Sequence, residues 1–269
     1  MKRQAPSTLV AAFDPPEASV IKREERTLIW REVRPGGDPV VVKLYRKRSA
    51  GSALRSRIMR FRAEREYRRL RHLQRWGIPC TEPLGWGAGW SPEHGFHEVL
   101  LMREVPNALP LRDHLKAALD GTGKAGLASV PLDPLFRIVR RMHESGFCNQ
   151  TLYARNVLVN RDSPVGEGYV VADVPRSWTF PRSIVGTKMA LFDLLDLASE
   201  LERLGVPPGS IPLEAYGLDD RARHWWARSR KRNSRGKLLR VARDAGVRVR
   251  WVAAWLFQRP HVPSSAHLL

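Results

Sequence analysis

Short apolar runs separated by glycine and proline dominate the first hundred residues. Runs of this kind are typical of β-strands, and they predict strands at residues 19–22, 27–33, 40–45, 84–89 and 99–105. A charged stretch without breakers at residues 53–76 interrupts them and ends at Gly77-Ile78-Pro79, as expected at the end of a long helix. The pattern therefore predicts an antiparallel meander of three strands, one helix and two further strands.

After residue 106 the apolar residues follow helical spacing. They predict helices at residues 111–119, 131–146 and 189–204, and a short hairpin with strands at residues 157–159 and 169–172. The glycine-rich residues 120–129 are expected to form a flexible connector. A phosphate-binding loop is not expected there, because alanine follows the lysine of Gly121-Thr122-Gly123-Lys124 and no strand precedes it.

This order of elements predicts an α+β protein with two lobes. The small lobe contains an antiparallel sheet and one helix, and the larger lobe is helical. The predicted domains are an N-terminal tail at residues 1–18, the sheet lobe at 19–106, the helical lobe at 107–217 and a basic C-terminal helical segment at 218–269.

Composition narrows the class of protein. The 269 residues are 43% hydrophobic, which is enough to form a sizeable core. Cys80 and Cys148 fit neither a disulfide framework nor a zinc site, so a reducing compartment is expected. His94 and His97 lack a matching ligand pair and are expected at the surface. The apolar run at residues 251–257 is far shorter than the roughly 20 residues that cross a bilayer.

The net charge of +19 indicates an anionic partner nearby. Nucleic acid, anionic lipid headgroups and phosphorylated glycolipid all fit, and an arginine-rich chain with a solvated basic surface is the simpler alternative. Residues 221–251 mix cations with Trp225, Trp226 and Trp251. This mixture suits an anionic membrane surface, RNA, or a merely solvated helical face.

A buried ion pair is predicted between the third strand and the first helix. Lys43 lies in an apolar strand, where an ammonium needs a counter-ion or a phosphate. In the helix, Glu66 falls inside the apolar arc while Glu64 points away. A strand lysine and an inward glutamate form the pair that aligns nucleotide phosphates in kinases. Alternatively, Glu66 pairs with a neighbouring arginine.

A second set of polar residues follows the helix that ends near Gly146. The loop from Asn149 through Thr151 runs into Asn156 at the start of a strand, and the returning strand ends at Asp173. Kinases have this order of catalytic loop, magnesium-binding asparagine and magnesium-binding aspartate. Asn156 and Asp173 are therefore candidate ligands for Mg²⁺. Both are also common turn residues.

Together these motifs make the chain resemble the lipopolysaccharide kinase family, which includes the Kdo and heptose kinases, over roughly residues 25–205. The resemblance is carried by short motifs in the family's order: Val42-Lys43-Leu44-Tyr45, Arg65-Glu66-Tyr67-Arg68-Arg69-Leu70, Trp76-Gly77-Ile78-Pro79-Cys80, His143-Glu144-Ser145-Gly146-Phe147, Leu152-Tyr153-Ala154-Arg155-Asn156-Val157-Leu158-Val159 and Asp193-Leu194.

The resemblance implies a protein-kinase-like fold, ATP with Mg²⁺, and a sugar hydroxyl of the lipid A inner core as acceptor. It implies a bacterial, cytoplasmic protein, peripheral at the inner membrane, whose partners are the anionic glycolipid and the membrane surface. Lys43 and Glu66 would bind ATP, and Asn156 and Asp173 would bind Mg²⁺. Asp193 would brace the catalytic loop; the alternative is a charge on the helix surface.

The catalytic loop departs from the family's pattern. Family members have an aspartate five residues before the asparagine and a histidine two residues before that, where this chain has Thr151 and Asn149. A threonine cannot act as general base, a role typically worth about 10²- to 10⁴-fold. The hairpin before Lys43 also lacks the glycines of a phosphate-covering loop. Three hypotheses follow: a weakened sugar kinase, a pseudokinase that binds nucleotide or glycolipid as a scaffold, and a basic nucleic-acid-binding protein.

Overall fold

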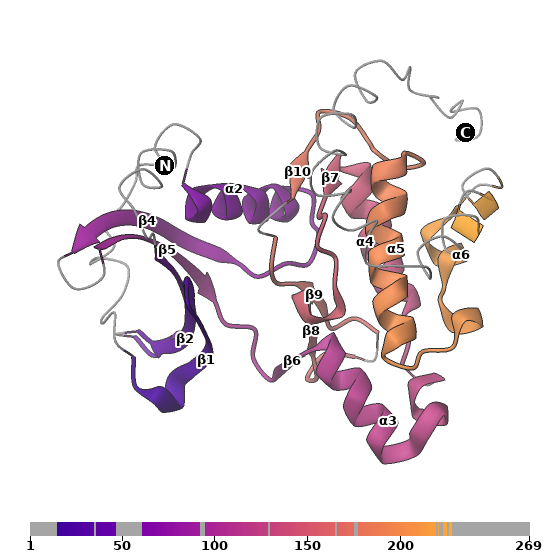
Figure 1. Cartoon of the computed structure of the whole chain (residues 1–269), viewed down its shortest axis with the longest axis horizontal. Helices are drawn as coiled ribbons and strands as arrows, with labels where there is room; N and C mark the ends of the chain where they lie inside the picture. The colour runs from indigo at the N-terminus through magenta and orange to yellow at the C-terminus, as the bar shows by residue number, and fades with distance from the viewer. Residues whose placement is uncertain are drawn as a thin grey trace. The chain divides into compact units, whose positions relative to one another are not determined.

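Figure 1 shows the computed structural model of the chain. It describes residues 15–34, 36–46, 61–91, 95–128, 130–164, 166–174 and 177–218, together with 220, 223–224 and 226–227. The chain divides into two compact units, residues 1–218 and 219–269. All helices and strands with assigned bounds lie in the first unit.

The N-terminal part is a five-stranded antiparallel sheet in the order β1-β2-β3-β5-β4. Its strands are β1 (Val20–Glu24), β2 (Thr27–Val33), β3 (Pro39–Arg46), β4 (Pro83–Ser91) and β5 (Gly95–Arg103), and η2 (Glu17–Ser19) precedes them. One face forms a core that includes Val40, Val42 and Leu44. Because side chains alternate along a strand, Lys43 and Tyr45 lie on the opposite face.

Helix α2 (Arg62–Arg75) packs against β4 and β5. Its apolar stripe turns Glu66 inward, as predicted, and the residue is fully buried. The N-terminus of the helix is capped from β5, since Glu98 accepts a hydrogen bond from the amide of Ala63 at 2.9 Å. The prediction that Glu64 points away was wrong in part, because Glu64 is 9% exposed and Arg68, one turn later, pairs with it at 2.8 Å.

The following part is mainly helical. Its helices are α3 (Leu111–Ala128), α4 (Asp133–Glu144), α5 (Lys188–Arg203) and α6 (Leu213–Tyr216), with short turns η3 (Ala154–Asn156) and η4 (Pro208–Ser210). Its strands are β6 (Ala108–Pro110), β7 (Phe147–Cys148), β8 (Val157–Asn160), β9 (Tyr169–Val171) and β10 (Trp178–Thr179). They form one sheet in the order β6-β8-β9 and a pair, β10-β7.

The predicted α+β class is confirmed, with the sheet and its one helix first and the helices with their short hairpin second. Two local predictions were wrong. Helix α3 continues to Ala128 where a flexible connector was expected, because glycine costs only about 1 kcal/mol in a helix and no proline interrupts this one. His97 is 2% exposed because it lies within β5, where its ring bonds the Gly95 carbonyl.

Other predictions stay open. The boundary near residue 106 and the role of the basic C-terminal segment stay predictions; almost all of that segment, with Trp225 and Trp251, lies outside the described residues. His94 and the tail up to residue 14 also lie outside them. Within the described ranges, no helix is both long enough and apolar enough to cross a membrane.

Candidate active site

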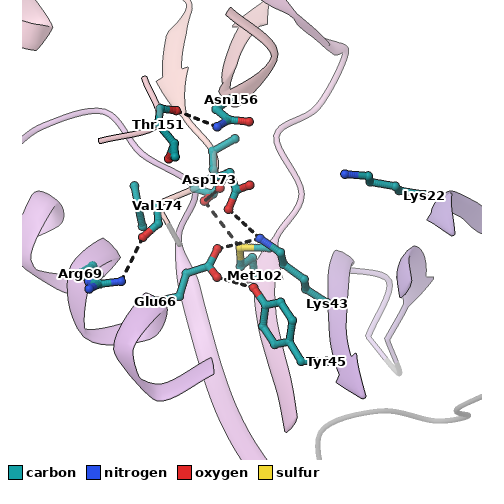
Figure 2. Close-up of polar contacts among 12 residues, drawn as sticks. Lys22, Lys43, Tyr45, Glu66, Arg69, Met102, Thr151, Asn156, Asp173 and Val174 are labelled. Atoms are coloured by element: carbon teal, nitrogen blue, oxygen red, sulfur yellow. Dashed lines mark hydrogen bonds and ion pairs between the residues drawn. The ribbon is translucent and has the colours of Figure 1, made fainter. Parts of the chain in front are cut away.

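The ammonium of Lys43 lies between two carboxylates from distant parts of the chain (Figure 2). Its Nζ is 2.8 Å from Oε1 of Glu66 on α2 and 2.7 Å from Oδ1 of Asp173, just after β9. The side chain of Lys43 is 5% exposed and that of Glu66 is fully buried, whereas that of Asp173 is 34% exposed. Lys43 thus has one buried counter-ion and one that faces solvent.

Backbone pairing brings Asp173 to this position. The segment between α2 and β4 bonds directly to β9, with the Val171 amide donating to the Pro79 carbonyl and the Thr81 amide donating to the Val171 carbonyl, each at 3.0 Å. Arg69 on α2 also donates to the carbonyl of Val174 at 3.4 Å. The end of β9 is therefore tied to the sheet and helix that carry Lys43 and Glu66.

The electrostatics of this cluster favour its charged state. Burial lowers the pKa of Lys43, but the charges of Glu66, Tyr45 and Asp173 outweigh it and raise this pKa well above its ordinary value. Burial raises the pKa of Glu66, and Lys43 opposes that rise. For Asp173, burial is again the largest influence, yet the nearby ammonium lowers the pKa below the usual range. The ammonium and Asp173 are consequently charged at neutral pH.

The loop that follows β7 begins with two backbone amides that bond to one carboxylate. Asp193 on α5 accepts hydrogen bonds from the amides of Asn149 and Gln150 at 2.6 and 2.7 Å. His143 also lies 3.3 Å from Asp193, through its Nε2. Gln150 has a φ of 58°, a left-handed conformation that such bonds help to stabilise. Asp193 is 1% exposed, so it is not a charge on the helix surface.

Asn156 is oriented so that its amide oxygen is available. The side-chain Nδ2 of Asn156 donates to the backbone carbonyl of Thr151 at 2.8 Å. The backbone carbonyl of Asn156 accepts from the amide of Ala172, next to Asp173, at 2.9 Å. Figure 2 shows Asn156 and Asp173 near one another. An amide oxygen and a partly exposed carboxylate suit Mg²⁺, which usually binds one or two protein groups plus waters and phosphates. No cluster of three His, Cys, Asp or Glu side chains suitable for a metal occurs among the described residues.

The position of the family's general base holds a closed polar pair. The hydroxyl of Thr151 donates to Oδ1 of Asn149 at 3.2 Å. Asn149 is fully buried, and its Nδ2 has no hydrogen-bond partner in the described part of the chain. Neither side chain can accept a proton at neutral pH. The loop is well positioned but lacks a base.

All six predicted site residues therefore lie in two adjoining groups. Lys43, Glu66 and Asp173 form the first, and Asn149, Thr151 and Asn156 form the second. Sequence reasoning missed Tyr45, whose hydroxyl donates to Oε2 of Glu66. Its position two residues after Lys43 on the same strand could have indicated that both reach the same helix.

Two comparisons show what the chain is similar to. The model of the lipopolysaccharide kinase (Kdo/WaaP) family matches residues 13–194. One similar solved structure is described as "WaaP in complex with acyl carrier protein"; it is 18% identical, with 89% of each chain covered and a TM-score of 0.48. No curated protein matches the chain.

Proposed function

Because the chain belongs to the lipopolysaccharide kinase (Kdo/WaaP) family, we propose that it transfers the terminal phosphate of ATP to a sugar hydroxyl of the lipid A inner core, at a reduced rate. The observation that carries the proposal is the Lys43 ammonium, held between Glu66 and Asp173. Membership of the family implies ATP as the phosphate donor. The acceptor, the metal and the reduced rate are the proposed parts.

The residues of the first group suit the binding and alignment of phosphates. Lys43 would donate to phosphate oxygens while Glu66 keeps the ammonium in place. Asn156 and Asp173 would hold Mg²⁺ through their side-chain oxygens. The metal would supply positive charge against the transferring phosphate. Phosphoryl transfer depends mostly on such positioning and charge neutralisation, so this group supports chemistry without a base.

The second group explains the reduced rate. In the transfer, the acceptor oxygen forms a bond to phosphorus, the bond to the leaving ADP oxygen breaks, and the acceptor hydroxyl loses its proton. Thr151 cannot take that proton, so it would pass to solvent or to a phosphate oxygen. Absence of the base would lower the rate by about 10²- to 10⁴-fold relative to a complete site.

The experiment is transfer of labelled phosphate from ATP to purified core glycolipid in the presence of Mg²⁺. The proposal expects slow transfer that needs Mg²⁺ and is lost in Lys43→Met. The proposal is overturned if wild type transfers phosphate no faster than Lys43→Met and Thr151→Asp transfers it no faster than wild type.

A pseudokinase is the second candidate, favoured by the closed pair of Thr151 and Asn149. It would bind nucleotide or glycolipid without transfer. The two candidates separate at Thr151→Asp: an enzyme with a weakened site gains activity, whereas a scaffold gains none. The scaffold is favoured if wild type and Thr151→Asp both bind ATP with Mg²⁺ and neither transfers phosphate.

The net charge of +19 supports an anionic partner, and the family's substrate favours glycolipid at the cytoplasmic face of the inner membrane. We expect the protein to co-sediment with phosphatidylglycerol vesicles and not with phosphatidylcholine vesicles. Tighter, steeply salt-dependent binding to RNA or DNA than to the anionic vesicles would support the nucleic-acid hypothesis instead.

A further inference from the structure

A buried histidine connects the brace of the loop to helix α6. His143, in the last turn of α4, is fully buried. Its Nε2 lies 3.3 Å from Oδ2 of Asp193 on α5, and its Nδ1 lies 2.7 Å from the hydroxyl of Tyr216 on α6. Each ring nitrogen therefore has a polar partner, and the two partners come from different helices.

The partners of Asp193 and His143 fix where the protons lie. Both oxygens of Asp193 accept from backbone amides, so the carboxylate is an acceptor and Nε2 of His143 donates to it. In a neutral ring Nδ1 then accepts, and the hydroxyl of Tyr216 donates. Burial raises the pKa of Tyr216 well above its ordinary value, so this hydroxyl keeps its proton. The contacts thus assign the tautomer of His143 that carries its proton on Nε2.

The Tyr216 side chain is held in place by α4. It is 1% exposed, and its ring meets the ring of His143 edge-on, with 5.5 Å between the ring centres. The guanidinium of Arg140, one turn before His143, lies 5.6 Å from the centre of the Tyr216 ring. Arg140 also donates to the carbonyls of Tyr216 and Gly217, each at 3.1 Å. The hydroxyl therefore has little freedom to turn away from Nδ1.

The same chain of contacts continues to a proposed metal ligand. Asp193 bonds the amides of Asn149 and Gln150. The carbonyl of the next residue, Thr151, accepts from Nδ2 of Asn156 at 2.8 Å and so orients the side-chain amide of Asn156. Its oxygen is the atom that the proposed function assigns to Mg²⁺. The position of Asp193 therefore affects both the loop and Asn156.

We propose that Tyr216 is a positioning residue, which holds His143 in the tautomer that donates to Asp193 and so keeps the loop and Asn156 in place. For its effect on phosphate transfer, the inference rests on the proposed function. The hydrogen bonds themselves involve no nucleotide, so the link from Tyr216 to the loop can be tested without it.

The test compares Tyr216→Phe with Tyr169→Phe. Each variant removes the hydroxyl of a buried tyrosine, and the hydroxyl of Tyr169 donates to the carbonyl of Pro131 at 2.8 Å, away from His143 and Asp193. The comparison separates the loss of the bond to His143 from the general cost of deleting a buried hydroxyl.

The first readout is the nitrogen NMR spectrum of protein labelled at histidine, with His143 assigned by means of His143→Gln. In wild type at neutral pH, Nε2 should be protonated and Nδ1 unprotonated. The Nδ1 signal should move downfield in Tyr216→Phe, because this nitrogen loses its donor, and should stay in place in Tyr169→Phe. A protonated Nδ1 in wild type, or an unmoved signal in Tyr216→Phe, would overturn the proposal.

The second readout is hydrogen exchange at the amides of Asn149 and Gln150. Relative to amides of α2, they should exchange about tenfold faster in Tyr216→Phe, because the buried Nδ1 is left without a donor and the ring no longer steadies Asp193. In a His143→Gln background, Tyr216→Phe should add nothing. Unchanged exchange relative to α2, or equal acceleration in Tyr169→Phe, contradicts the proposed role.

The third readout is the rate of phosphate transfer from ATP to core glycolipid with Mg²⁺. Tyr216→Phe should lower kcat about tenfold, because Asn156 is less well oriented, while Lys43 and Glu66 are untouched. A wild-type kcat in Tyr216→Phe would also refute the proposal. If wild type transfers no phosphate, the proposed function fails, and the first two readouts still decide the role of Tyr216.

If Tyr216→Phe does not fold, 3-fluorotyrosine at position 216 replaces it as the probe. The fluorinated hydroxyl is more acidic and a stronger donor, so the Nδ1 signal of His143 should move upfield. A downfield shift, or none, would rule out the bond on which the proposal depends.

Discussion

The group around Lys43 and the loop after β7 are equally well positioned, but only the first has the side chains that its proposed role requires. Around Lys43, each carboxylate has its partner and Glu66 has donors on both oxygens. In the loop, Asp193 fixes the backbone of Asn149 and Gln150, yet the side chains there offer no base. The contrast shows that a loop can keep its position without keeping its catalytic side chain. Its position depends on buried backbone hydrogen bonds, and a change of side chain at position 151 leaves these bonds intact.

The largest expected effect comes from restoring the missing base. Thr151→Asp should raise phosphate transfer by about 10²- to 10⁴-fold, because a carboxylate can accept the acceptor's proton. Oδ1 of Asn149 contacts Thr151 and its Nδ2 has no partner in the described structure, so the amide can turn over and donate to the new carboxylate. The measurement is the initial rate with labelled ATP and core glycolipid.

Thr151→Asn is the matched control for this prediction. It has nearly the shape of Thr151→Asp but no basic oxygen, so its rate should stay near that of wild type. Equal rates in the two variants would show that the base is not what the loop lacks.

The next largest effect should come from the ion pair. Lys43→Met leaves the fully buried Glu66 carboxylate without its ammonium and should lower the free energy of unfolding by about 3–5 kcal/mol at neutral pH. The loss should shrink at acidic pH as Glu66 takes up a proton. Denaturant unfolding at several pH values measures it.

Lys22→Met provides the reference for the ion pair. Lys22 lies opposite Ile29, which lies opposite Lys43, but its pair with Glu24 is exposed. Its replacement should change stability by no more than about 0.5 kcal/mol. Losses of equal size at the two lysines would contradict the picture of a buried, functional cation.

The smallest of these effects concerns the brace of the loop. Asp193→Asn keeps one oxygen that can accept from a loop amide but places an NH₂ group against the other amide, which also donates. It should lower the free energy of unfolding by about 1.5–3 kcal/mol. Hydrogen exchange at Asn149 and Gln150 should speed up while α2 is unaffected. Glu144→Gln, which alters a partly exposed pair with Arg140, should do neither. Unchanged exchange at the loop would show that it is held by other contacts.

Sequence reasoning succeeded where local periodicity decides direction. The apolar stripe of α2 turns Glu66 inward, and the alternation of side chains along β3 places Lys43 on the face opposite the core residues of that strand. The ion pair between Lys43 and Glu66 was therefore predictable. The order of loop, asparagine and aspartate likewise indicated that Asn156 lies close to the end of the returning strand. The bond from the amide of Ala172, next to Asp173, to the carbonyl of Asn156 agrees with this. These features depend on spacing within one element or hairpin.

Contacts that need three-dimensional register were missed. Glu98 caps α2 from β5, and this contact does not follow from spacing within one strand. The spacing of Tyr45 from Lys43 indicates the face of the sheet on which Tyr45 lies, but not that its hydroxyl bonds Glu66. The length of α3 was underestimated because glycine lowers helix propensity without forbidding a helix. His97 was misplaced because the strand that buries it was predicted to begin at residue 99, whereas β5 begins at Gly95.

The most direct test of the central claim is a calorimetric titration of ATP, with and without Mg²⁺, into wild type and Asp173→Asn. If Lys43, Glu66, Asn156 and Asp173 form a site for a metal-bound triphosphate, wild type binds one ATP per chain, Mg²⁺ tightens the binding, and Asp173→Asn loses that gain. Absence of binding by wild type, or an undiminished gain from Mg²⁺ in Asp173→Asn, would contradict the account.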